Sequence, residues 1–134
     1  MQIKDYLNKL LAVIAESSFI ESQNFSFEER HPSAAYITGS ITFINGSNLN
    51  FKEFIIIKSE SVSFLKYAYH YSAKDKSLIF RYDNALDPKA RNLSTYPEHK
   101  HTSKELVCAG RPLFKEILKE ISELLQDVSV PARK

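Results

Sequence analysis

Histidine, arginine and tyrosine gather in three clusters between residues 67 and 101, within roughly a quarter of this 134-residue chain. Histidine titrates near neutral pH, and arginine and lysine bind phosphate groups. The concentration of histidines and basic side chains beside tyrosines therefore predicts proton-transfer chemistry on an anionic substrate. Three of the four histidines lie in the clusters, which are Tyr67-Ala68-Tyr69-His70-Tyr71, Phe80-Arg81-Tyr82-Asp83-Asn84 and Tyr96-Pro97-Glu98-His99-Lys100-His101.

The first two clusters are expected to lie on neighbouring antiparallel strands. A two- or four-residue connection within residues 73–76 predicts a register in which Ser72 faces Ser77. This register places three pairs of residues opposite each other, which are His70 and Ile79, Ala68 and Arg81, and Lys66 and Asp83. One sheet face would then be aromatic, and the other would gather Lys66, His70, Arg81 and Asp83.

On the polar face, Asp83 could orient a cation and His70 could move a proton. The alternative is an ordinary solvated sheet face with cross-strand ion pairs. The aromatic face is expected to pack under helices rather than to stack nucleic-acid bases.

His99 and His101 would point to the same side of an extended segment, about 7 Å apart, with Lys100 on the other side. This spacing is found among metal ligands, and Asp83 or Glu53 could supply a third ligand. Two histidines without cysteines more often serve other roles, so we predict acid–base work and no metal. The fourth histidine, His31, precedes a proline and is expected in a turn.

Glu53 is expected on an apolar sheet face. A three-residue loop at Asn45-Gly46-Ser47 would place Ile37, Gly39, Ile41 and Phe43 opposite Ile55, Glu53, Phe51 and Leu49. Gly39 would then leave room for Glu53. A carboxylate in such surroundings should be paired or have a raised pKa. It is either a structural hydrogen-bonding group or a poised acid–base group.

The elements that position these residues form a single α+β domain over residues 1–134. Apolar side chains at helical spacing predict an N-terminal helix over residues 2–16 and a C-terminal helix over residues 112–126. About five strands are expected between them, at residues 25–29, 35–44, 49–57, 64–72 and 77–84. Their succession predicts an antiparallel meander, with the C-terminal helix packed on one sheet face. Residues 131–134 are expected to fray.

Composition limits the functional classes without selecting one. The single cysteine, Cys108, excludes an internal disulfide and a cysteine-rich zinc site, and we expect it to be a small buried side chain. The formal net charge of +2 is too small to demonstrate nucleic-acid binding. No apolar run approaches the ~20 residues of a membrane span, and no signal peptide is recognised. We therefore expect a cytoplasmic protein without membrane contact.

Four segments, in this order and spacing, resemble a known family. They are Leu49-Asn50-Phe51-Lys52-Glu53-Phe54, Lys66-Tyr67-Ala68-Tyr69-His70-Tyr71, Leu78-Ile79-Phe80-Arg81-Tyr82-Asp83-Asn84-Ala85 and Tyr96-Pro97-Glu98-His99-Lys100-His101. The chain is similar over most of its length to the TumE family of toxins from bacterial and archaeal type II toxin–antitoxin systems. The resemblance implies a helix-turn-helix antitoxin as partner and ribosome-dependent cleavage of messenger RNA. Residues 86–94 depart from the family pattern by being longer and more basic.

The predicted activity is that of an endoribonuclease, an mRNA interferase, that uses acid–base chemistry without a metal or another cofactor. His70 and His101 would be base and acid in either order, Arg81 would hold the phosphate, and Asp83 would orient Arg81 or a histidine. His99 completes the predicted catalytic group. Lys66, Asn84, Lys100 and Glu53 are the predicted substrate contacts.

Two other functional classes stay open at this point. A non-enzymatic module could grip RNA, the ribosome or a protein through Lys66, Arg81, Lys89, Arg91 and Lys100. A metal-dependent nuclease or phosphohydrolase could use His99, His101 and a carboxylate. The expected partners are the antitoxin, RNA or ribosome-bound messenger RNA, and as an alternative a second copy that pairs edge to edge.

Overall fold

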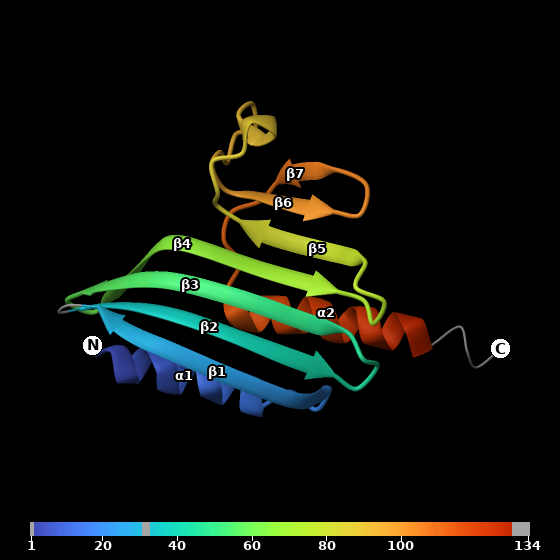
Figure 1. Ribbon diagram of the computed structural model, residues 1–134, viewed down its shortest axis with the longest axis horizontal. Coiled ribbons are helices and arrows are strands. Elements are labelled where there is room, and N and C mark those ends of the chain that lie inside the picture. Colours follow the sequence, from blue (N-terminus) through green and yellow to red (C-terminus); the bar gives the residue numbers. More distant parts are fainter. Residues whose placement is uncertain (1, 31–32, 130–134) are drawn as a thin grey trace.

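In the computed structural model of this protein, a seven-stranded antiparallel sheet carries two helices on one of its faces (Figure 1). The structure describes residues 2–30 and 33–129. The strands lie in the sheet in chain order, as a meander. The elements are α1 (Ile3–Ala15), β1 (Ile20–Arg30), β2 (Ala34–Phe43), β3 (Asn48–Lys58), β4 (Ser61–Ser72), β5 (Leu78–Asp83), the 3₁₀ helix η1 (Pro88–Ala90), β6 (His99–Thr102), β7 (Leu106–Cys108) and α2 (Phe114–Ser129).

The expected α+β architecture is confirmed, and the described sheet has seven strands where about five were predicted. The two additional strands, β6 and β7, are only 4 and 3 residues long, which is too short for a periodic pattern to show. Cys108 ends β7 and is exposed, so the expectation that it is buried was wrong. The turn expected at His31 and the frayed end expected at residues 131–134 lie outside the described residues.

Both helices bury most of the apolar stripe that their sequences predict, except that Leu11 of α1 is 42% exposed. Helix α1 buries Ile3, Leu10 and Ile14, and its first turn is closed by Asp5, whose Oδ2 accepts the backbone N–H of Gln2 at 2.8 Å. Helix α2 buries Phe114, Ile117, Leu118, Ile121 and Leu125 against the same sheet face. Alternate residues of β3 and β4 point to the same side and complete this core. Because both helices lie on this side, the opposite sheet face is not covered by a helix, and we call it the open face.

The first predicted hairpin register is wrong by two residues. The backbone N–H of Phe43 donates to the carbonyl of Ser47 at 2.9 Å, and Gly46 adopts a φ of +86° that favours glycine. The loop is therefore 44–46 rather than 45–47. Gly39 consequently lies opposite Phe51, and Glu53 lies opposite Ile37. A shift of two residues preserves the alternation, so Glu53 still points to the buried face.

The second predicted hairpin register is also wrong. The N–H of Ala73 donates to the carbonyl of Ser77 at 2.9 Å, so the loop has three residues, and β5 contains one extra residue at a β-bulge. His70 therefore lies opposite Arg81, and Ala68 lies opposite Asp83. The predicted pairs of His70 with Ile79, Ala68 with Arg81 and Lys66 with Asp83 do not form. Lys66 instead lies opposite Phe54 of β3.

Candidate active site on the open sheet face

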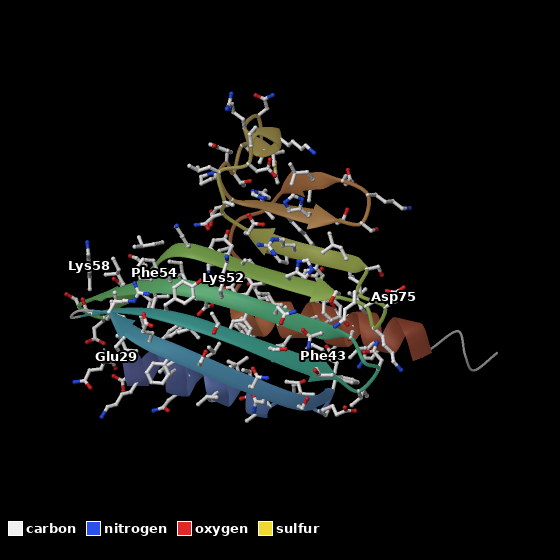
Figure 2. All side chains as sticks on the ribbon, in the orientation of Figure 1. Glu29, Phe43, Lys52, Phe54, Lys58 and Asp75 are labelled. Carbon is white, nitrogen blue, oxygen red and sulfur yellow. The ribbon has the colours of Figure 1, made fainter. Side chains whose placement is uncertain are left out.

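The open sheet face presents two rows of side chains that run across the strands and are polar except for Ala68. One row is Lys52, Ala68, Asp83 and His99, and the adjacent row is Asn50, His70, Arg81 and His101. Figure 2 shows Lys52 projecting from this face, away from the helices. The observed register places His70 directly opposite Arg81, where the predicted register had paired His70 with Ile79. The pairing of β5 with β6 adds His99 and His101 beside Asp83 and Arg81.

Arg81 lies at the centre of this group. Its Nε donates to Asp83 Oδ2 at 2.8 Å, and its Nη1 lies 3.2 Å from His70 Nδ1. Because a guanidinium only donates, Nδ1 of His70 is the acceptor, and the proton of the neutral ring is on Nε2. Burial, followed by the positive charge of Arg81, lowers the pKa of His70. His70 is therefore held in its neutral form at neutral pH.

Asp83 joins Arg81 to the two histidines of β6. Its side chain is only 5% exposed, and Oδ1 accepts the backbone N–H of Ala85 at 2.9 Å. Nε2 of His99 lies 3.0 Å from the same Oδ1, whereas Nε2 of His101 lies 3.9 Å from Oδ2. Arg81 thus links Asp83 to His70, and Asp83 in turn meets both histidines of β6.

His99 and His101 project to the same side of β6, as expected, with their ring centroids 4.8 Å apart. Nδ1 of His99 lies 2.7 Å from the carbonyl of Pro97 and donates to it. Nε2 of His99 is buried and has no hydrogen-bond partner among the described residues, because Asp83 is near but not aligned with it. His101 is 31% exposed and therefore accessible.

Lys100 and Asn84 lie apart from this group. Lys100 points to the helix side of the sheet, where Nζ contacts Glu120 of α2 at 2.8 Å and lies 4.8 Å from the centre of the Tyr82 ring. The side chain of Asn84 hydrogen-bonds to the backbone of β4. Its Oδ1 accepts the N–H of Tyr67, and its Nδ2 donates to the carbonyl of Leu65. Both side chains therefore hold the scaffold together.

Glu53 lies on the opposite side of the sheet, under the helices, and is fully buried. It accepts hydrogen bonds from the hydroxyls of Tyr6 and Tyr69, and Nη2 of Arg111 is 3.3 Å away. Burial, followed by the nearby charge of Glu53, raises the pKa of both tyrosines. Of the two interpretations of Glu53, this arrangement supports the structural one.

Lys66 is on the open face and exposed, two residues along β4 from Ala68. Two further residues of this face were missed in the sequence. Lys52 lines a shallow hollow together with Asn50, His70 and Arg81, and Asp87 lies 3.9 Å from His101. The alternation within β3 could have identified Lys52, because it places that lysine on the polar face. Asp87 follows an irregular segment whose path no local pattern predicts.

The fold and this site define a small α+β protein whose sheet is covered on one face and bears a histidine–arginine–aspartate cluster on the other. The family model described as Toxin TumE matches residues 10–130. The chain therefore belongs to the TumE toxin family, which confirms the resemblance found in the sequence. The match spans every strand of the described sheet and the whole cluster.

Membership in this family makes the protein a toxin and implies an antitoxin partner. Comparisons with curated proteins and with solved structures gave no match. Within residues 2–30 and 33–129, no helix has the length and apolar character needed to cross a membrane.

Proposed function

We propose that this toxin is an endoribonuclease that cleaves ribosome-bound messenger RNA in the cytoplasm, on the open sheet face and by metal-free acid–base chemistry. The observation that supports this most is the row formed by His70, Arg81 and His101, which occupy neighbouring positions on β4, β5 and β6. Adjacent strands are about 4.8 Å apart, so the Cα atoms of the two histidines are about 10 Å apart with Arg81 between them. Across such a gap, the imidazoles of His70 and His101 can approach one phosphodiester from opposite sides.

In the proposed reaction, a base removes the proton of a ribose 2′-hydroxyl, and the oxygen attacks the adjacent phosphorus. The bond from phosphorus to the 5′ oxygen breaks as an acid protonates that oxygen. The products are a 2′,3′-cyclic phosphate and a 5′-hydroxyl. A proton-transfer residue of this kind contributes about 10²- to 10⁴-fold in rate.

His70 is assigned as the base. Its pKa is lowered by burial and by Arg81, so it is neutral and able to accept a proton at neutral pH. Nδ1 is held by Arg81 in the free protein. When Arg81 turns its guanidinium to a phosphate, Nδ1 of His70 is released to accept the proton, so substrate binding and activation of the base are coupled.

His101 is assigned as the acid because it is the accessible histidine on the other side of Arg81. Asp83 orients Arg81 through the 2.8 Å contact and is a positioning residue. His99 is too buried to reach RNA, and it acts by packing against Asp83. Lys52 and Lys66 on the same face would contact flanking phosphates.

Glu53, Asn84 and Lys100 are assigned no contact with RNA in this proposal, because their side chains are bound within the scaffold. For the antitoxin, we propose the helix-turn-helix protein that the family resemblance implies. It would inhibit the toxin by covering the open face.

The test compares His70→Gln and His101→Gln with wild type by mapping messenger-RNA 5′ ends after induction in one bacterial host. Each variant is expected to lose about 10²- to 10⁴-fold in cleavage. In a purified translation mixture, wild-type cleavage should persist with a chelator that binds transition metals but leaves the Mg²⁺ that ribosomes require. Arg81→Gln should also lose cleavage, whereas Arg30→Gln, which removes the same charge at the exposed end of β1, should retain it.

Circular dichroism must first show that each variant is folded. A folded His70→Gln, His101→Gln double variant that cuts RNA at the wild-type rate would exclude these roles. Growth arrest by the double variant without new RNA ends would instead indicate a toxin that inhibits by binding.

A further inference from the structure

Asp83, His99 and His101 bring three ligand-type atoms together, all within 4.8 Å of one another. Two of the three residues are buried, and Nε2 of His99 has no hydrogen-bond partner within the described part of the chain. A buried polar atom without a partner costs about 1–3 kcal/mol. The catalytic roles proposed above do not use this nitrogen, so its burial beside a carboxylate requires another explanation.

The position of His99 relative to Asp83 fits two ligands of one metal ion. Nε2 and Oδ1 are 3.0 Å apart, yet the imidazole nitrogen is not directed at the oxygen as a hydrogen bond requires. Ligands at about 2.1 Å from a metal are separated by about 3.0–3.4 Å for octahedral to tetrahedral angles. The two atoms therefore already have the separation of neighbouring ligands.

His101 would complete the site after a small movement. Its Nε2 is 3.9 Å from the other carboxylate oxygen of Asp83, Oδ2. The three ligand-type atoms lie within 4.8 Å of one another, so the imidazole must move by up to about 1.4–1.8 Å to reach the ligand separation above. The side chain is 31% exposed, so rotation toward Asp83 meets less resistance than it would in a packed core. Asp87, also 3.9 Å from His101, adds negative charge beside the position of the ion.

The surroundings of these residues also suit ligation. The 2.7 Å contact with the Pro97 carbonyl places the His99 proton on Nδ1 and leaves Nε2 with a free lone pair. Arg81 and the backbone N–H of Ala85 each hold one oxygen of Asp83. Hydrogen bonds of this kind, from neighbours to the ligands, are typical of metal sites in proteins.

We propose that Asp83, His99 and His101 form a binding site for a divalent first-row transition-metal ion such as Zn²⁺. Two imidazoles favour such ions over Mg²⁺ and Ca²⁺, which prefer oxygen ligands. The sequence predicts acid–base work without a metal and offers these histidines as metal ligands only in an alternative, a metal-dependent nuclease or phosphohydrolase. If His101 is the acid of the proposed function, ligation occupies its Nε2, and the metal inhibits cleavage rather than supporting it.

Binding is measured on the purified full-length chain after chelation, by calorimetry with Zn²⁺ and by the visible absorption of added Co²⁺. One ion per chain is expected, with binding weakened roughly 100-fold by His101→Gln or His99→Gln. His70→Gln removes a histidine two strands away and should bind as wild type does, which makes it the matched control.

His101→Gln is the decisive variant because its side chain is partly exposed and its loss should leave the fold intact. No saturable binding up to about 1 mM metal would overturn the proposal, as would equal affinities of wild type and His101→Gln.

The predicted inhibition by metal rests on the proposed function, whereas the metal site itself does not. An RNA-cleavage assay therefore distinguishes failure of the proposed function from failure of the metal site. Zn²⁺ should inhibit wild-type cleavage in a purified translation mixture, and a zinc-selective chelator that leaves Mg²⁺ on the ribosomes should restore it. Activation by Zn²⁺, with binding that depends on His101, would overturn metal-free catalysis and inhibition while supporting the site. Saturable binding by a protein that never cleaves RNA would overturn the proposed function and still support the site.

Discussion

Replacing Glu53 with glutamine is expected to lower the free energy of unfolding by about 3 kcal/mol. The glutamine has the same size and retains one carbonyl oxygen, so little packing changes. The substitution removes the negative charge of the carboxylate, which accepts hydrogen bonds from the hydroxyls of Tyr6 and Tyr69 and forms an ion pair with Arg111 at 3.3 Å. The substitution therefore tests the electrostatic part of the contact between the sheet and the segment before α2.

The magnitude follows from the burial of the two charges. Breaking a buried ion pair by removing one partner costs about 3–5 kcal/mol, and one hydrogen bond to a charged group contributes about 1.5–3 kcal/mol. Glu53 is 0% exposed, but Arg111 is 15% exposed and stacks on Phe64 with 3.4 Å from its Cζ to the ring centre. Partial exposure and the Phe64 ring therefore stabilise the positive charge of Arg111 even without Glu53. We accordingly expect a loss at the low end of the range for a broken buried ion pair, about 3 kcal/mol.

Urea unfolding followed by far-ultraviolet circular dichroism measures the effect, and the melting temperature should fall by roughly 10 °C for a chain of this size. Glu123→Gln on the exposed surface of α2 is the matched control and should change the free energy of unfolding by less than about 0.5 kcal/mol. A Glu53→Gln variant within about 0.5 kcal/mol of wild type would show that the charge of Glu53 contributes no net stability.

A double-mutant cycle with Arg111→Met isolates the interaction of the pair. The double variant should lose less stability than the sum of the two single variants, by about 1–3 kcal/mol, because no charge is left uncompensated. Strict additivity would show that Glu53 and Arg111 are not energetically coupled.

Two further predictions concern His70 and Gly39. An NMR titration of the His70 imidazole should give a pKa below that of an ordinary histidine. Arg81→Gln should raise this pKa but leave it below the ordinary value, because burial is the larger cause of the shift and the other cross-strand neighbour, Asn50, is uncharged. Because the folded chain holds His70 neutral, unfolding takes up a proton in acid, so its contribution lowers stability as the pH falls below about 6.5; an ordinary or raised pKa would contradict this. Gly39→Ala should cost about 1–3 kcal/mol by urea unfolding, because the new Cβ would lie 2.5 Å from Phe51 Cζ. Gly110→Ala, whose Cβ would have ordinary contacts, is the control, and equal stabilities of the two variants would refute the packing argument.

Alternation along each strand was sufficient to predict which sheet face a side chain occupies. Glu53 was expected on an apolar face and is buried there, and His99 and His101 were expected on one side of an extended segment. Both helices were also predicted from their apolar spacing. These properties are local, because a side chain's face depends on its own strand's pleat and on the apolar partners along it.

The neighbours of each side chain depended on loop geometry that the pattern does not contain. Each of the two predicted hairpin registers was wrong by two residues, which preserved the faces and changed every cross-strand pair. The second loop places Lys76 at a φ of +77°, a conformation that no glycine signals, and a bulge in β5 adds one residue. The pairing of His70 with Arg81 therefore could not be read from the alternation alone.

The amino-acid pattern alone was enough to predict the two helices, the alternating faces of the long strands and the side chains that are candidates for catalysis. Three features depend on how the whole sheet packs. Asp83 lies beside His99, His101 and Arg81, and Lys100 points to the helices. One imidazole nitrogen, Nε2 of His99, is buried without a hydrogen-bond partner among the described residues. The face of a side chain follows from a period of two residues within one strand. Its contacts follow from loop lengths, bulges and the pairing of strands as short as β6 and β7, which are set only when the whole sheet packs.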